Sequence, residues 1–114
     1  MNPGNPAMPS IPITAVDQVS SALSLASLRN QALASNIANR ETEGYQRLQA
    51  QFSEALRGGA AHPVIAPEAA TGAAPSLEQD MVALSTNALH YQALARVLSR
   101  YFSIQETIAS GGRS

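Results

Sequence analysis

The side chains that could catalyse a reaction or bind a metal are few and scattered in this sequence. The two histidines, His62 and His90, have no acidic residue beside them at the spacing of metal ligands. Glu41 and Glu43 could form a carboxylate pair for acid–base chemistry, but nothing apolar around them would raise a pKa. We therefore expect the histidines to make ordinary solvent or packing contacts. We expect the glutamates to lie in a solvated joint, balanced by the arginines on either side.

Other functional motifs are missing from the sequence. There is no Gly-x-Ser-x-Gly elbow for a nucleophilic serine, and no Gly-rich loop opens a helix to hold a phosphate. Because the chain contains no cysteine, it has no disulfide or thiolate metal site. The net charge of −1 gives no basic patch dense enough for nucleic acid. These observations predict a protein that is not an enzyme and that uses no cofactor and no metal.

The composition and the positions of Gly and Pro predict an all-α fold for this chain of 114 residues. Pro and Gly cluster at the start and in the middle, and two long segments between them contain neither. We expect two long helices packed as an antiparallel coiled-coil-like pair, partly disordered until assembled. No cationic start followed by an apolar run precedes them, and no segment has the length of a membrane helix. The expected divisions are a flexible arm at 1–13, a core helix at 14–43, a signature loop and short extension at 44–57, a flexible bridge at 58–75, a second core helix at 76–110 and a tail at 111–114.

The first helix is expected to begin at Thr14, an N-cap three residues before Asp17. Its apolar residues alternate at spacings of three and four, which is typical of a coiled-coil seam. Asn30 interrupts this seam, and two interpretations stay open: it fixes the register, or the helix turns it toward water. The seam contains Val16, Val19, Leu23, Ala26, Asn30, Leu33 and Ile37.

The second helix is expected to begin with a capping box, Ser76 to Gln79, directly after Pro75. Two apolar stripes follow along it, and since one partner helix covers only one stripe, at least two neighbours are expected. The small, Ala-rich pair predicts a marginal monomer that becomes ordered when other subunits cover the second stripe. The first stripe is Leu77, Met81, Leu84, Ala88, Tyr91, Ala95, Leu98 and Phe102; the second is Leu94, Val97, Tyr101, Ile104 and Ile108.

A motif stands at the end of the first helix. Asn36 and Asn39 fall in its last turn, Gly44 suits the positive φ of a helix exit, and Tyr45 can hold the departing chain on the helices. The stretch "SNIANRETEGY" resembles the signature of the axial proteins of the bacterial flagellum: a Ser/Ala-Asn-Ile/Leu-Ala-Asn run and then Thr-x-Gly-Tyr. The segment "NALHYQALARVLSRYFSIQETI" is similar to the C-terminal helix of the proximal rod protein, FlgB type. The signature positions are Ser35, Asn36, Ile37, Ala38, Asn39, Thr42, Gly44 and Tyr45.

This resemblance implies a structural subunit of the flagellar rod. Such proteins pair their terminal helices and assemble around a central export channel, so the implied work is torque transmission and channel lining. The implied partners are copies of the chain, other rod proteins, membrane-ring and export-gate components, and the flagellar type III export apparatus, with no nucleic acid. The implied location is the periplasmic rod of the basal body, reached without a cleaved signal peptide.

The chain departs from the family pattern in places, and one alternative function stays open. Glu43 stands where the family commonly has Pro, and the region between the helices is shorter than usual. The alternative is a small helical adaptor, or a secreted coiled-coil protein, that binds a partner helix. In either case the expected packing and assembly residues are Val16, Val19, Leu23, Leu33, Leu84, Tyr91, Leu94, Leu98, Tyr101 and Phe102.

Overall fold

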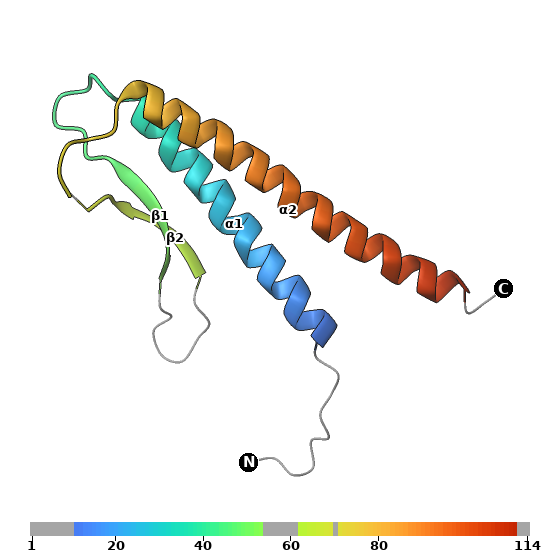
Figure 1. Ribbon diagram of the computed structural model, residues 1–114. Coiled ribbons are helices and arrows are strands. Elements are labelled where there is room, and N and C mark those ends of the chain that lie inside the picture. The colour runs from blue at the N-terminus through green and yellow to red at the C-terminus, as the bar shows by residue number, and fades with distance from the viewer. Residues whose placement is uncertain (1–10, 54–61, 70, 112–114) are drawn as a thin grey trace, which may run out of the picture.

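The computed structural model describes residues 11–53, 62–69 and 71–111. Two long helices dominate it, α1 (Ile11–Ala38) and α2 (Leu77–Gly111). They lie side by side and run in opposite directions (Figure 1). The prediction of two helices packed together is confirmed. Expected features of residues 1–10, 54–61, 70 and 112–114, including most of the arm and the tail, lie outside the described residues.

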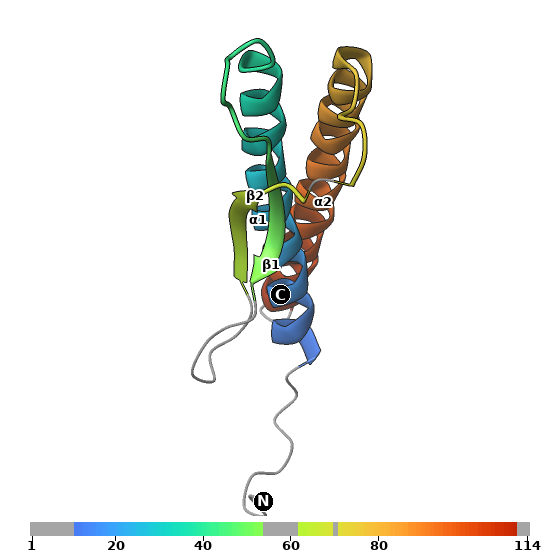
Figure 2. The same cartoon turned by 90° about the vertical axis from the view of Figure 1, so that its left-hand side faces the viewer.

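The prediction of a purely helical fold is wrong. Between the helices the chain forms two antiparallel strands, β1 (Leu48–Ser53) and β2 (His62–Pro67). Their register runs from the pair Leu48–Pro67 to the pair Ser53–His62. These strands occupy parts of the segments expected to be an extension and a flexible bridge. The hairpin lies along α1, and α1 contacts all three other elements (Figures 1 and 2).

The strand β2 forms although it contains two prolines. The amide nitrogen of Glu68 donates to the carbonyl of Arg47 over 2.8 Å, so residues 47 and 68 form a hydrogen-bonded pair of the ladder. Because such pairs alternate along antiparallel strands, Pro63 and Pro67 occupy the positions whose nitrogens face away from β1. Neither proline therefore interrupts the ladder, and β-branched Val64 suits the strand between them.

The helix boundaries differ from those expected by a few residues. α1 begins at Ile11 rather than Thr14, because Pro12 is tolerated in a first turn, where its missing N–H costs no hydrogen bond. Thr14 therefore lies inside the helix and not before its first residue. α1 ends at Ala38 rather than Glu43, so Asn39 lies just past the helix. The capping box of α2 is confirmed: Gln79 N donates to Ser76 Oγ (3.1 Å), and Ser76 N donates to Gln79 Oε1 (2.8 Å).

The two helices meet across a narrow seam. Ala26 and Ala32 of α1 are the buried apolar residues of the described chain, and on α2 the buried residues are Asp80 and Asn87. The seam of α2 is therefore rotated by about one residue from the expected one, which placed Ala88 where Asn87 lies. The expected packing residues that are half-buried are Val16, Val19, Leu23, Leu33, Leu84, Leu94, Leu98 and Tyr101.

Two aromatic residues expected in the packing are largely exposed. Tyr91 is 42% exposed and Phe102 is 52% exposed, and Phe102 contacts the ring of Tyr101 edge-on at 5.7 Å. The apolar residues of the second stripe are also exposed toward the end of α2, with Ile108 at 65%. Contact with α1 therefore leaves a large apolar surface of α2 uncovered within the described residues. The exposed large apolar residues of α2 are Leu77, Met81, Val82, Leu89, Tyr91, Val97, Phe102, Ile104 and Ile108.

Candidate functional site

The signature residues form a tight exit from α1. The amide nitrogen of Thr42 donates to the carbonyl of Asn39 (3.0 Å), and that of Tyr45 donates to the carbonyl of Thr42 (3.1 Å). Gly44 has a φ of +80°. A bond between the first and fourth residues and a positive φ at the third position define a type II turn, which requires glycine there. The expected positive φ at Gly44 is confirmed, and it reverses the chain toward the hairpin.

The side chain of Asn36 joins the helix to the first strand. It is 2% exposed, and its amide makes two hydrogen bonds with the backbone of one residue. Nδ2 donates to the carbonyl of Leu48 (2.9 Å), and Oδ1 accepts from the amide nitrogen of Leu48 (2.8 Å). These are the two bonds that a paired strand would make, so the amide satisfies the outward-facing backbone groups of Leu48 where β1 begins.

Tyr45 closes this arrangement with its hydroxyl. The hydroxyl donates to Oδ1 of Asn36 (3.0 Å) and lies 2.7 Å from Oγ of Ser35. Asn39 and Thr42 complete the loop, because Asn39 Nδ2 donates to the carbonyl of Ser35 (3.0 Å) and Thr42 Oγ1 donates to Asn39 Oδ1 (3.0 Å). The structure thus brings the polar signature residues into one network, while half-buried Ile37 and exposed Ala38 complete the helical run between them.

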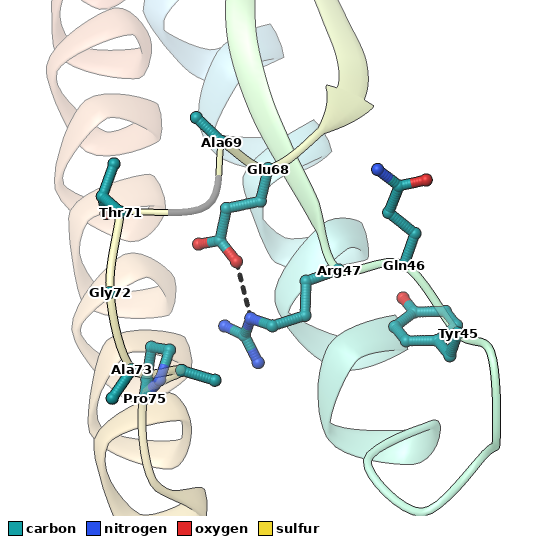
Figure 3. A pocket seen from close by; sticks show the side chains of 10 residues that line it. Tyr45, Gln46, Arg47, Glu68, Ala69, Thr71, Gly72, Ala73 and Pro75 are labelled. Carbon is teal, nitrogen blue, oxygen red and sulfur yellow. Dashed lines mark hydrogen bonds and ion pairs between the residues drawn. The ribbon is translucent and has the colours of Figure 1, made fainter.

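A cluster of charged side chains connects the same joint to α2. Asp80, in the first turn of α2, is 2% exposed and receives both terminal nitrogens of Arg47, each at 2.9 Å. Arg40 also reaches Asp80 at 3.1 Å and donates to the carbonyl of Pro75 at 3.3 Å. Figure 3 shows the third bond of Arg47, from Nε to Glu68 at 2.6 Å. The chain just before β1, the end of β2 and the start of α2 therefore meet at one guanidinium.

The electrostatics of this cluster hold its groups in their charged forms. Hydrogen bonds from Arg47 lower the pKa of Asp80, the charges of both arginines add to this effect, and burial opposes it. The hydrogen bond to Asp80 likewise raises the pKa of Arg47 above its already high ordinary value. Neither group can exchange a proton near neutral pH, so the cluster is suited to holding elements together and not to acid–base catalysis.

A second polar contact lies between the helices. Asn87 of α2 is 5% exposed, and its Nδ2 donates to the carbonyl of Ala26 on α1 over 2.8 Å. A side chain that bonds to the backbone of the facing helix fixes the register of the pair. Asn30 is exposed, so its interpretation as a residue facing water is confirmed. The polar residue that fixes the register of the helix pair is Asn87.

The remaining candidates for chemistry do not come together. His62 at the start of β2 and His90 on α2 are both exposed, as expected. Within residues 11–53, 62–69 and 71–111, no group of three acidic or histidine side chains is placed to hold a metal. In the same part of the chain, no helix is long and apolar enough to cross a bilayer. Glu41 and Glu43 are exposed, as expected. The two arginines expected to balance their charge instead form ion pairs with Asp80 and Glu68.

Arg47, Glu68, Asp80 and Asn87 were not among the residues expected from the sequence. Asp80 follows the capping box at a position where an acid is explained by the helix dipole alone. Arg47 and Asp80 are far apart along the chain, and no local pattern pairs them. A buried interhelical asparagine also breaks the apolar periodicity by which a seam is recognised. The sequence feature that could have predicted this contact is Asn87 itself, an asparagine between the apolar seam residues Leu84 and Tyr91.

One of the comparisons with known proteins matched the segment that contains this joint. A family model described as flagella basal body rod protein matches residues 19–46, which cover most of α1 and the turn up to Tyr45. The match confirms the resemblance stated from the signature: over this segment the chain is similar to flagellar basal-body rod proteins, and a structural role in the basal-body rod is supported. No curated protein and no solved structure matched the chain in the other two comparisons.

Proposed function

We propose that this chain is a structural subunit of the proximal part of the flagellar rod, of the FlgB type. One observation carries the proposal: the segment similar to rod proteins, residues 19–46, contains Asn36 and Arg40, whose side chains tie β1 and α2 to the end of α1. The signature is thus a joint that orients three elements of a building block. Such a role needs no pocket, cofactor or titrating group.

The exposed face of α2 supports assembly with other subunits. A single large apolar patch on a small protein marks an interaction surface. The uncovered residues Val97, Ile104 and Ile108 repeat at helical spacing and share one face of α2, and Phe102 is exposed on another face. Other copies and other rod proteins are the proposed partners for this face, and membrane-ring and export-gate components are the proposed neighbours at the end of the rod. Torque transmission and lining of the channel would follow from that packing, and export would follow the flagellar type III route.

Localisation tests this proposal most directly. A tagged copy should be recovered with intact hook–basal bodies, and deletion of the gene should abolish motility. Replacing Ile104 and Ile108 together by Ser should abolish incorporation, since the exposed stripe is the proposed contact. The matched control is Ser85→Ala with Ser110→Ala, two exposed serines of the same helix, which removes no apolar contact and should leave incorporation unchanged. A diffuse cytoplasmic signal in a flagellated cell would overturn the rod assignment.

The adaptor alternative predicts different behaviour. An adaptor would stay soluble at a defined stoichiometry with one partner, and its loss would leave basal bodies intact. The proposed rod subunit should instead be a marginal monomer. Circular dichroism on dilute protein should show a broad melt that sharpens with concentration, because other copies supply the missing contacts. A sharp cooperative melt with no concentration dependence would contradict this expectation.

A further inference from the structure

The loop that carries the signature has two acidic groups, Glu41 and Glu43, that pair with none of the described residues. Both glutamates are exposed. The loop itself is well fixed, by the bond from Thr42 to Asn39 and by the turn at Gly44. Two carboxylates on a preorganised turn at one end of the helix pair form a surface that can bind cations at little entropic cost.

A basic surface lies on α2. Arg96 and Arg100 are one helical turn apart, both are exposed, and no described residue pairs with either. Like charges at this spacing disfavour a helix slightly unless an acid lies between them. Together with Ser99, Ser103 and Ile104, they line a shallow hollow of about 420 Å³. The hollow thus combines two guanidinium groups, two hydroxyls and one apolar side chain.

The basic surface faces away from α1. Leu94 and Leu98 are half-buried on the side of α2 that contacts α1. Arg96 and Arg100 each lie two residues from Leu98, a rotation of about 200° around an α-helix. The hollow is therefore on the opposite side of α2 from α1, where a second molecule has access to it.

The acidic loop cannot reach the basic hollow of its own molecule. The loop lies beside the start of α2, where Arg40 contacts Asp80. Arg96 and Arg100 lie farther along the same helix, at roughly 25–30 Å from Asp80 with 1.5 Å per residue. The joint holds the loop beside the N-terminal end of α2. Its charges can therefore meet the hollow only on another copy, shifted along the long axis of the molecule, which extends 61 Å.

We propose that Glu41 and Glu43 of one copy bind the hollow formed by Arg96 and Arg100 of the next copy. This inference rests on the proposed rod function and names one contact by which copies join. The two surfaces differ, so a copy that has bound through one of them still offers the other, and the contact propagates from copy to copy. The contact joins side chains of opposite charge at the surface, so it is strongest at low salt.

Charge reversal tests the contact. The full-length protein is studied by sedimentation at low and at high salt. Replacing Glu41 and Glu43 by Arg, or Arg96 and Arg100 by Glu, should weaken self-association about tenfold or more at low salt, because each attraction becomes a repulsion. Combining both double substitutions in one chain should restore it. The matched control is Glu106→Arg, an exposed acid elsewhere on α2, which should change association less than twofold.

Cross-linking gives an independent measurement. The chain contains no cysteine, so Glu43→Cys and Arg100→Cys introduce one thiol each. A disulfide requires Cα atoms about 4.4–6.8 Å apart, and a mixture of the two variants should form it in high yield. As the control, a mixture of the Glu43→Cys and Asp17→Cys variants should form no disulfide between the two. Absence of self-association, equal association of the reversed variants, or no specific disulfide would overturn the inference. A chain that still enters basal bodies after charge reversal would overturn this contact alone, whereas a diffuse wild-type chain would overturn the proposed function.

Discussion

Asn36 offers the sharpest test of the joint, because two other asparagines of the same segment, Asn30 and Asn39, serve as references. Replacing it by Ala removes the bonds to both backbone groups of Leu48 and the bond from the hydroxyl of Tyr45. Three hydrogen bonds at about 0.5–1.5 kcal/mol each contribute roughly 1.5–4.5 kcal/mol. Alanine returns about 0.5 kcal/mol through its higher helix propensity. We expect Asn36→Ala to lower the free energy of unfolding by about 1–4 kcal/mol.

The assay compares three asparagines in one protein. Asn39→Ala loses two bonds in a more open position and should cost about 0.5–1.5 kcal/mol. Asn30→Ala removes an exposed side chain and should be neutral or slightly stabilising. Unfolding by urea, followed by circular dichroism in a stabilising osmolyte, gives all three values. If Asn36→Ala fell within 0.5 kcal/mol of Asn30→Ala, the view that this side chain holds β1 on α1 would be refuted.

Further predictions concern the charged cluster and the turn. The pKa of Asp80 is lower in the folded than in the unfolded state, so its contribution to stability is present above about pH 4 and is lost as the pH falls below that value. Acid unfolding of Asp80→Asn should therefore show a smaller slope between about pH 2 and 4 than the wild type, and equal slopes would contradict the pairing. Glu43→Pro places proline at the second position of a type II turn and should stabilise the chain by about 0.4–1 kcal/mol in thermal melts. The same change removes one acidic group of the proposed contact, so stability should rise while self-association falls. Gly44→Val should cost about 1–3 kcal/mol and impair assembly, because its φ of +80° is strained for a β-branched residue. The same change at Gly58 should be milder, and equal effects would count against the joint. Ser76→Ala should cost about 0.5–2 kcal/mol by removing the cap of α2.

The features predicted correctly are those that depend on residues close together in the chain. The capping box at Ser76 and the positive φ at Gly44 each involve four residues or fewer, and local chemistry decides them. The two helices follow from long segments free of Gly and Pro. The grouping of Asn36 with Tyr45 also followed from a short motif.

The hairpin was missed for a physical reason. Its second strand carries two prolines in six residues, a composition typical of a loop. Only the register shows that both prolines face away from the ladder, and the register depends on Asn36 satisfying the first residue of β1. Strand formation here is thus a consequence of docking on α1 and not of local preference.

The polar contacts between the helices were missed because periodicity counts apolar residues. Asp80 and Asn87 are buried by bonds to Arg47 and to the backbone of Ala26, which the chain brings together only after the helices pair. The apolar pattern on α2 correctly indicated more apolar surface than one partner covers. It did not indicate which stripe faces α1.

The pairing of Ser53 with His62 has a consequence for how the sequence can change. The last pair of the ladder lies at the end of the hairpin remote from the joint at Asn36, Arg47 and Asp80. Lengthening a connection between two ends that are already held together costs only about 0.6 kcal/mol for each doubling of its length. The chain between these two residues is therefore the place where evolution, or an engineer, could insert an entire domain. The paired helices would then stay the same, while the connection between Ser53 and His62 could differ from one protein to another.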